Sequence, residues 1–228
     1  GKTFQTLGFL AWLKDKRHAL GLPKQPMLIV APTSLLNNWI DEETLHLFDP
    51  GLGTPGLLFG SELKSFKEKG CSNDIAEGRS TLGTSDLMEC DWLLTTYETL
   101  RDYQISIGKL RLSCVVFDEM QKVKNPGSLT THASKTLNAD FALGLTGTPI
   151  ENSLSDLWCI CDTLLPGFLG DLKSFMNDYP EDDRSKLTEL HTKLLERSDI
   201  LPQPILRRMK SDILTDLPEK REHLLDEY

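Results

Sequence analysis

The sequence predicts an α/β fold in which a parallel β-sheet is sandwiched by helices, with a helical appendage near the C-terminus. Three observations lead to this prediction. Short apolar runs alternate with segments whose apolar residues recur at helical spacing. These apolar runs are continuous, as in strands buried on both faces of a sheet. After Leu165, helical patterns follow one another without strands between them.

The predicted strands are short and are bounded by turn-forming or polar residues. Met27–Ala31 lies between prolines, and Cys114–Phe117 ends in two acidic residues. The other predicted strands are Trp92–Thr95, Phe141–Leu145 and the candidate Leu57–Phe59. Ligands of parallel sheets bind beyond the carboxyl ends of the strands. Polar residues directly after these runs are therefore candidates for a functional site.

The predicted helices begin near the N-terminus, where Leu7, Leu10 and Ala11 recur at helical spacing after Thr3. Asp15–Pro26 contains Gly21 and Pro23 and predicts a loop. Ser34 is suited to cap the next helix, whose apolar face would be Leu36, Trp39, Ile40 and Leu47. The remaining predicted helices are Tyr97–Tyr103, Leu129–Leu137, Ser153–Leu165, Leu172–Tyr179 and Ser185–Arg197.

Two segments fall outside this alternation of strands and helices. Cys71–Met88 is polar, has no clear period and predicts an irregular excursion. The change of pattern after Leu165 predicts a division into a sheet domain, residues 1–165, and a helical region, residues 166–228. No internal repeat or low-complexity tract is present.

Composition narrows the class of protein. The 228 residues are 39% apolar and carry 25 Lys and Arg against 34 Asp and Glu, a net charge of −9. That balance argues against a simple basic nucleic-acid-binding module, although backbone amides and a few local cations can still contact phosphates. Five cysteines without a CxxC pair argue against a disulfide framework and a zinc site. With no apolar run of membrane-spanning length and no signal peptide, a cytoplasmic location is expected, or a nuclear one in a eukaryote.

The first three residues, Gly1-Lys2-Thr3, match the end of a phosphate-binding loop, GxxxxGK[ST]. A helix that starts at once would present free N–H groups to a phosphate. In that role Lys2 would reach the β- and γ-phosphates and Thr3 would ligate Mg²⁺. The alternative is an ordinary polar helix start. Because the chain opens on Gly1 instead of Met, we expect it to belong to a longer protein.

Two acidic residues, Asp118 and Glu119, follow the apolar run that ends at Phe117. Carboxylates there are costly unless they stand at the exposed end of the strand. At that position Asp118 can bind Mg²⁺ and Glu119 can orient and polarise an attacking water. The alternative is an acidic turn. Together with Lys2 and Thr3, these two acidic residues favour a site that holds a metal ion and a triphosphate.

A third polar segment, Thr146-Gly147-Thr148-Pro149, follows the run that ends at Leu145. Its small residues allow a tight turn, and its two hydroxyls can form hydrogen bonds with neighbouring polar groups. On its own it is compatible with an unremarkable strand-to-turn connection.

In this order the segments resemble the Swi/Snf-type ATPases of helicase superfamily two, specifically the N-terminal RecA-like lobe of such motors. The matching segments span nearly the whole chain, and the strings around motifs II and III are the most specific. Motifs I, Ia, Ib, II and III and the end of the lobe correspond to GKTFQT, LIVAPTSLLNNW, LLTTYETLRD, VVFDEMQKVKNPGS, LGLTGTPIENSLSDLW and PILRRMKSDILTDLPEK.

The resemblance implies a role for each matching residue. Gly1, Lys2, Thr3, Asp118 and Glu119 would serve ATP, Mg²⁺ and the attacking water, with Lys2, Asp118 and Glu119 as the catalytic residues. Gln121, Thr146 and Thr148 would couple the nucleotide to DNA. The residues implied on the double-stranded DNA are Pro32, Thr33, Ser34, Thr95, Thr96, Lys122, Lys124 and Asn125. The alternative for the two lysines is a solvated loop. Arg207 and Arg208 would brace the lobe or its partner.

Two features depart from the family pattern. Met120 stands where these proteins usually have Ala or Gly, which leaves both acidic residues in place. The early phosphate-loop glycines, the adenine-reading segment and a second RecA-like lobe with its arginine finger are not within these residues. We therefore expect an ATP-driven translocase on double-stranded DNA whose isolated 228 residues hydrolyse ATP negligibly. The alternatives are a strand-separating helicase, which the KVKNPGS extension disfavours, and a non-catalytic nucleotide- or partner-binding scaffold.

Overall fold

The computed structural model describes residues 1–147, 153–195 and 203–206. The chain divides into two compact units, residues 1–176 and 177–228. The first unit contains a five-stranded sheet in the order β2-β3-β1-β5-β7, in which every strand pair is parallel. Its strands are β1 (Met27–Val30), β2 (Pro55–Leu58), β3 (Trp92–Thr95), β5 (Cys114–Asp118) and β7 (Ala142–Leu145). The predicted α/β fold with a parallel sheet is confirmed.

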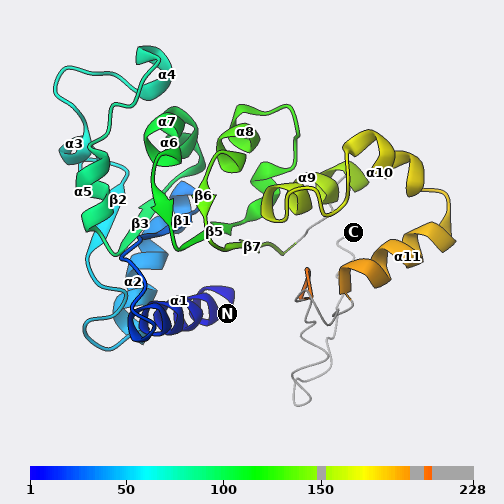
Figure 1. Ribbon diagram of the computed structural model, residues 1–228, viewed down its shortest axis with the longest axis horizontal. Helices are drawn as coiled ribbons and strands as arrows, with labels where there is room; N and C mark the ends of the chain where they lie inside the picture. Colours follow the sequence, from blue (N-terminus) through cyan, green and yellow to red (C-terminus); the bar gives the residue numbers. More distant parts are fainter. Residues whose placement is uncertain (148–152, 196–202, 207–228) are drawn as a thin grey trace, which may run out of the picture. The chain divides into compact units, whose positions relative to one another are not determined.

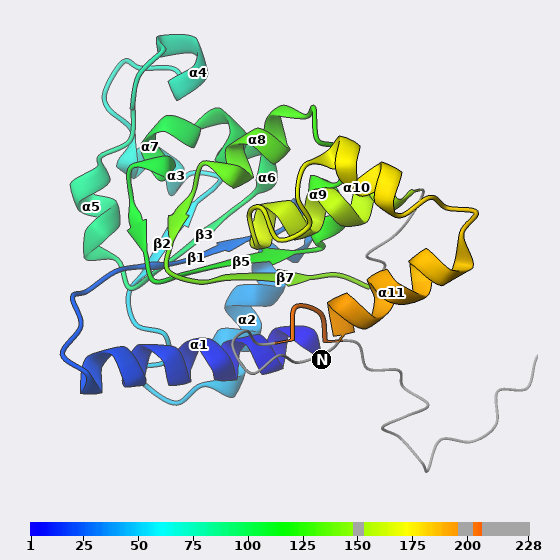
Figure 2. The same ribbon diagram turned by 45° about the vertical axis from the view of Figure 1, so that its right-hand side comes forward.

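Helices cover both faces of this sheet (Figures 1 and 2). On one face lie α1 (Lys2–Ala19) and α2 (Leu36–His46). On the other face lie α6 (Tyr97–Asp102), α7 (Gln104–Gly108), α8 (Leu129–Lys135) and α9 (Leu154–Leu164). The central strands β1, β3 and β5 are buried along their whole length, which explains why their sequences are almost entirely apolar.

Alternate residues of each strand enter two separate hydrophobic cores. Leu28, Leu93 and Val115 pack in the core beneath α6 to α9. Ile29, Leu94 and Val116 pack against Leu7, Leu10 and Trp39 of α1 and α2. This period-two alternation follows from the pleat of the strands. β7 differs from the central strands because all four of its residues are half-buried.

The structure corrects several predicted boundaries. α1 continues to Ala19, so the predicted loop Asp15–Pro26 is wrong at its start. Most of residues 14–19 are good helix formers, and Lys16, Arg17 and His18 in the last turn favour the negative end of the helix dipole, so the helix stops only before Gly21. Ser34 does not cap α2: it lies within the 3₁₀ turn η1 (Thr33–Leu35), and α2 starts without a side-chain cap.

The segment predicted as an irregular excursion contains two short helices, α4 (Asp74–Glu77) and α5 (Thr84–Glu89), and α3 (Leu63–Phe66) precedes it. α4 lies at the tip of a long connection (Figure 1). Asp74 is fully buried and fastens this connection to α7. Its carboxylate accepts hydrogen bonds from the backbone N–H and the hydroxyl of both Thr81 and Ser106, at 2.6–2.8 Å.

Smaller elements complete the described chain. The strand pair β4 (Arg111–Leu112) and β6 (Asn138–Ala139) and the 3₁₀ turn η2 (Met120–Val123) were not predicted. α10 (Leu172–Asp178) follows α9, and α11 (Arg184–Leu195) lies in the second unit, where Leu190 and Leu194 are buried. Among the residues that the structure describes, no helix combines the length and the hydropathy that a membrane span needs.

Candidate nucleotide site

The candidate site lies along the carboxyl edge of the sheet, where several predicted residues follow adjacent strands. Asp118 ends β5, and Thr146 comes directly after β7. Pro32 and Thr33 follow β1, and Thr96 follows β3. Because all the strands are parallel, their ends meet at one edge and these residues become neighbours.

Lys2 reaches this edge from the first turn of α1. Its ammonium nitrogen lies 3.9 Å from the position that a Cβ on Gly147 would occupy. Burial raises the pKa of Asp118, and the positive charge of Lys2 at the same edge is a small effect that opposes this rise. The amine and the carboxylate predicted to share a triphosphate therefore converge. Gly1 precedes the helix, and Thr3 is half-buried in the same first turn.

The side chain of Asp118 is held on both of its oxygens. Its Oδ2 accepts a hydrogen bond from the Trp39 indole Nε1 at 3.0 Å, and its Oδ1 accepts one from the Glu119 backbone N–H at 3.0 Å. The Tyr97 hydroxyl donates to the Asp118 backbone carbonyl at 2.7 Å. Burial raises the pKa of Asp118, and the Trp39 and Glu119 hydrogen bonds partly oppose that rise.

Glu119 is the only non-glycine residue with a positive φ in the part of the chain that the structure describes, with φ 49° and ψ 55°. A left-handed conformation costs a residue with a Cβ roughly 1–2 kcal/mol and persists where surrounding contacts impose it. The conformation directs the Glu119 side chain toward Gln121, whose Nε2 donates to Glu119 Oε2 at 2.7 Å. The strain is therefore located at the residue predicted to act on water.

Gln121 connects this acidic turn to the end of β7. Its Oε1 accepts a hydrogen bond from the Thr146 hydroxyl at 2.8 Å, while its Nε2 holds Glu119. One side chain thus spans the segment after β5 and the segment after β7. Thr148, which was predicted to share the coupling role, lies outside the described residues, as do Arg207 and Arg208.

The residues predicted to contact DNA differ in their accessibility. Thr33, Ser34, Lys122 and Asn125 are exposed, and Pro32 and Lys124 are half-buried. Thr95 is fully buried and donates its hydroxyl hydrogen to the Leu58 carbonyl at 3.4 Å. Thr96 caps α6 by accepting from the Thr99 N–H at 3.0 Å. A direct phosphate contact by Thr95 would require its hydroxyl to leave the interior, so its predicted DNA role stays a prediction.

Two residues of the site were missed as functional by the sequence reasoning, which placed Trp39 on an apolar helix face and Tyr97 in a helix. Trp39 and Tyr97 hold the side chain and the backbone of Asp118, respectively. Their positions inside the segments that resemble motifs Ia and Ib were the available signal. Neither residue carries a charge, so a search for titratable residues passes over both.

Hard oxygen donors are present for Mg²⁺, namely the Asp118 carboxylate and the Thr3 hydroxyl. Mg²⁺ commonly takes only one or two carboxylate ligands and completes its shell with water and phosphate oxygens. Each Asp118 oxygen accepts a single hydrogen bond from the protein, so lone pairs remain for metal-bound water. The donor set fits a magnesium–nucleotide better than an all-protein cage, and the described residues contain no cluster of three metal-binding side chains.

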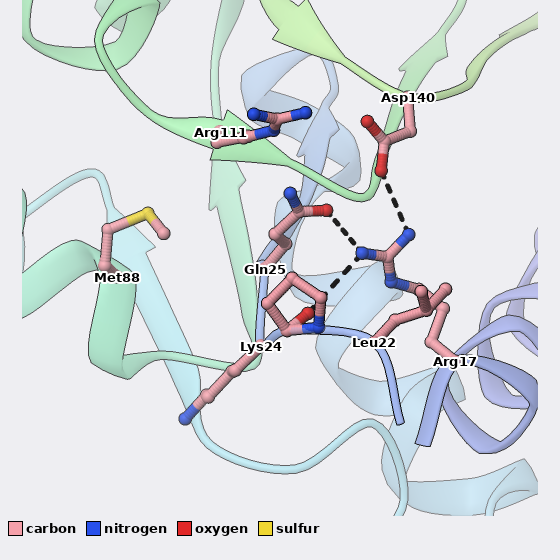
Figure 3. Close-up of a pocket in the computed structure, with 8 residues that line it drawn as sticks. Arg17, Leu22, Lys24, Gln25, Met88, Arg111 and Asp140 are labelled. Carbon is pink, nitrogen blue, oxygen red and sulfur yellow. Dashed lines mark hydrogen bonds and ion pairs between the residues drawn. The ribbon is translucent and has the colours of Figure 1, made fainter. Parts of the chain in front are cut away.

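A cavity of about 420 Å³ lies at the opposite edge of the sheet (Figure 3). Arg17 crosses its rim, with Nη1 donating to Asp140 Oδ2 at 3.0 Å and Nη2 donating to Gln25. Lys24 and Arg111 also line it. The residues here precede strands, and none was predicted for the site. This edge fastens the end of α1 to the segment before β7, away from the acidic turn.

A parallel sheet that brings a lysine and adjacent acidic residues to its carboxyl edge has the arrangement of a P-loop-type nucleotide-binding lobe. Residues 1–226 match the SNF2-related domain. The chain belongs to the SNF2-related family, and its resemblance to the Swi/Snf ATPase core is confirmed.

Individual relatives agree with this assignment. The Zorya protein ZorD of Escherichia coli O139:H28 is 41% identical over 97% of this chain, and the ISWI chromatin-remodeling complex ATPase ISW1 of Saccharomyces cerevisiae is 30% identical over 97%. The Sulfolobus solfataricus SWI2/SNF2 ATPase core in complex with double-stranded DNA aligns over 96% of the chain with a TM-score of 0.71 and 29% identity. The chain spans 20% of ZorD, 18% of ISW1 and 40% of the Sulfolobus chain.

Proposed function

We propose that this chain is the first lobe of an ATP-driven motor that translocates along double-stranded DNA and remodels DNA–protein complexes. The observation that carries the proposal is that Lys2, beside Gly147, lies at the same sheet edge as Asp118 and Glu119, and that Gln121 joins Glu119 to Thr146. A nucleotide site alone would not need that last connection. A motor needs it, because the state of the nucleotide must be transmitted to the surface that holds DNA.

The residues at the carboxyl edge of the sheet have different roles in ATP hydrolysis. Lys2 binds the β- and γ-phosphates, and α1 directs its N-terminal N–H groups toward them. Asp118 and Thr3 hold Mg²⁺, which when bound neutralises charge on the transferred phosphoryl group. Glu119 accepts a hydrogen bond from the attacking water and aligns it. Trp39 keeps the Asp118 carboxylate in a fixed orientation for this task.

The DNA surface is formed by the exposed segments after the strands. Thr33 and Ser34 are exposed at the end of β1 and can donate hydroxyl hydrogens to phosphates. Lys122 and Asn125 are exposed in and after η2, directly after the acidic turn. Contacts to phosphates carry no base information, so the motor should act without sequence preference. The solved relative that binds double-stranded DNA supports this choice of partner.

The proposal includes a second RecA-like lobe in the same full-length protein. An arginine finger contributes on the order of 10³–10⁵ in rate to phosphoryl transfer. The relatives are several times longer than this chain, which leaves room in them for further domains. The complete reaction would then occur between this edge and the second lobe.

Replacing Glu119 with Gln in the full-length protein tests the proposal. We expect DNA-stimulated ATP hydrolysis to fall by about 10²–10⁴, because the general base is lost, while ATP binding persists. The matched control is Glu89→Gln, an exposed glutamate on α5, which should leave hydrolysis unchanged. A scaffold that only binds nucleotide would show no hydrolysis in the wild-type protein and no response to the substitution.

Translocation and strand separation are distinguished by two substrates. A translocase should displace a third strand from a triplex in an ATP-dependent reaction without unwinding the underlying duplex. The Glu119→Gln variant supplies the background for both measurements. Efficient unwinding of a blunt duplex would contradict the translocase proposal and favour a strand-separating helicase.

A further inference from the structure

Met120 is the residue in the acidic turn that departs from the pattern of the proteins this sequence resembles, which usually carry Ala or Gly there. It lies between Glu119 and Gln121 and begins η2. Its side chain has no exposed surface. A buried methionine needs considerably more space than a buried alanine, so some neighbour must provide that space.

Gly144 of β7 provides it. A Cβ added to Gly144 would lie 2.4 Å from the Met120 sulfur and 2.8 Å from Leu164 Cδ1. The backbone of Gly144 does not have a positive φ, so its conformation is open to any residue. The glycine therefore matters for space and not for its backbone conformation, because an added Cβ would force the Met120 and Leu164 side chains to move.

The contact lies close along the chain to the Gln121 hydrogen bond. Gly144 is in β7, and Thr146 follows the last residue of that strand, Leu145. Met120 packs at Gly144, and Gln121 accepts the hydrogen bond of Thr146. Two consecutive residues after Glu119 are thus held by β7 and by the residue that follows its end.

This double anchor explains how the left-handed conformation of Glu119 is maintained. On its N-terminal side, Asp118 is held by Trp39 and Tyr97. On its C-terminal side, the Lys122 N–H donates to the Glu119 carbonyl at 3.1 Å, and Met120 fills the space at Gly144. A strained residue needs such constraints on both sides.

We infer that the packing of Met120 against Gly144 positions Glu119 for the attack of water, so that Met120 and Gly144 are positioning residues of the ATPase. The inference rests on the proposed ATP hydrolysis. Met120 fills the space beside Gly144. A smaller residue at position 120 could fill that space only if position 144 of β7 carried a larger side chain. Met120 and Gly144 share one packed space, so a substitution at either position should change the position of the Glu119 side chain.

The test uses the full-length protein with Gly144→Ala, Met120→Ala and the double variant. Overpacking at Gly144 displaces Met120, so we expect kcat for DNA-stimulated hydrolysis to fall about tenfold in Gly144→Ala. The KM for ATP should stay within about twofold, because neither Met120 nor Gly144 is among the residues proposed to hold the phosphates. The double variant should recover most of the lost kcat, since its two methyl groups fit where one methionine lay.

The matched control is Gly8→Ala, an exposed position in α1 where an added Cβ meets nothing within 4 Å. It should hydrolyse ATP at the wild-type rate. If Gly144→Ala does not fold, Met120→Ala alone carries the test and should lower kcat without raising KM, because the turn loses its anchor.

Three outcomes would overturn the inference. They are a wild-type kcat in Gly144→Ala, a double variant no faster than Gly144→Ala, and, where Met120→Ala carries the test, an unchanged kcat in that variant. Absence of hydrolysis by the wild-type protein would instead refute the proposed function, so the two failures are distinguishable.

Discussion

Trp39 of α2 donates its indole hydrogen to Asp118 Oδ2 over 3.0 Å, and Trp39 has no exposed surface. The hydrogen bond joins residues 79 positions apart in the sequence. It stabilises the ionised form of a carboxylate whose pKa burial raises. A residue that looks like ordinary core packing therefore helps to keep Asp118 charged.

Substituting Trp39 with Phe should shift the acid limb of the ATPase pH profile. Loss of the hydrogen bond raises the pKa of Asp118 further, so the carboxylate proposed to bind Mg²⁺ is neutralised at a higher pH than in the wild type. Activity should then decline earlier as the pH falls. The measurement is kcat/KM against pH in the full-length protein at saturating DNA.

Trp92→Phe is the control for that shift. Trp92 is also buried in the α1–α2 core and donates its Nε1 hydrogen, but to the Gly53 carbonyl at 3.3 Å. Its loss should lower stability without moving the acid limb. Equal shifts in both variants would show that general loosening of the core, and not the bond to Asp118, is responsible.

Replacing Gln121 with Glu should reduce the factor by which DNA stimulates ATP hydrolysis. A carboxylate at position 121 cannot donate a hydrogen bond to Glu119 and repels its negative charge. It can still accept the hydrogen bond from the Thr146 hydroxyl. We expect DNA to stimulate ATP turnover several-fold less than in the wild type. Turnover measured with and without duplex DNA checks this, and an unchanged ratio would remove Gln121 from the coupling route.

Asp74→Asn should destabilise the connection that carries α4 without affecting the catalytic chemistry. Each Asp74 oxygen accepts from one backbone N–H, that of Thr81 or that of Ser106, so an amide nitrogen in either place faces a buried donor that it cannot satisfy. The expected cost is about 1–3 kcal/mol in the free energy of unfolding. Chemical denaturation measures it.

Asp86→Asn, an exposed change on neighbouring α5, is the control for Asp74. It should have an effect within about 0.5 kcal/mol. Similar losses at both positions would contradict the assigned role of the Asp74 hydrogen bonds.

The isolated 228 residues should hydrolyse ATP negligibly even with duplex DNA present. In the proposed motor the second lobe supplies the arginine finger, which is worth on the order of 10³–10⁵ in rate. A phosphate-release assay against the full-length protein gives the comparison. Robust turnover by the short chain would show that this lobe is self-sufficient.

The sheet and its site were predictable from sequence to different extents. Met27–Val30 and Cys114–Asp118 are buried on both faces, so their composition alone identified them as strands. α1 was predicted too short because its last residues contact no core, and apolar spacing detects only buried faces. The pairing β4–β6 was missed because two residues are too few to form a pattern.

Within the site, charge and motif order identified Asp118, Glu119 and Gln121, but not how they are held. The bond from Trp39 and the space at Gly144 are long-range relationships. The local sequence does not indicate these roles, because a tryptophan predicts a core position and a glycine predicts a turn. Only the folded chain shows that Met120 and Gly144 occupy complementary volumes.

The ion pair of Arg17 with Asp140, at the edge far from the nucleotide, has a structural consequence. Lys2 lies beside Gly147 at the other end of the same helix. From Lys2 to Arg17 a helix rises roughly 23 Å, and an extended segment from Asp140 to Gly147, which contains β7, would cover roughly the same length. The helix and this segment therefore approach each other at both ends, through an ion pair at one end and through Lys2 beside Gly147 at the other.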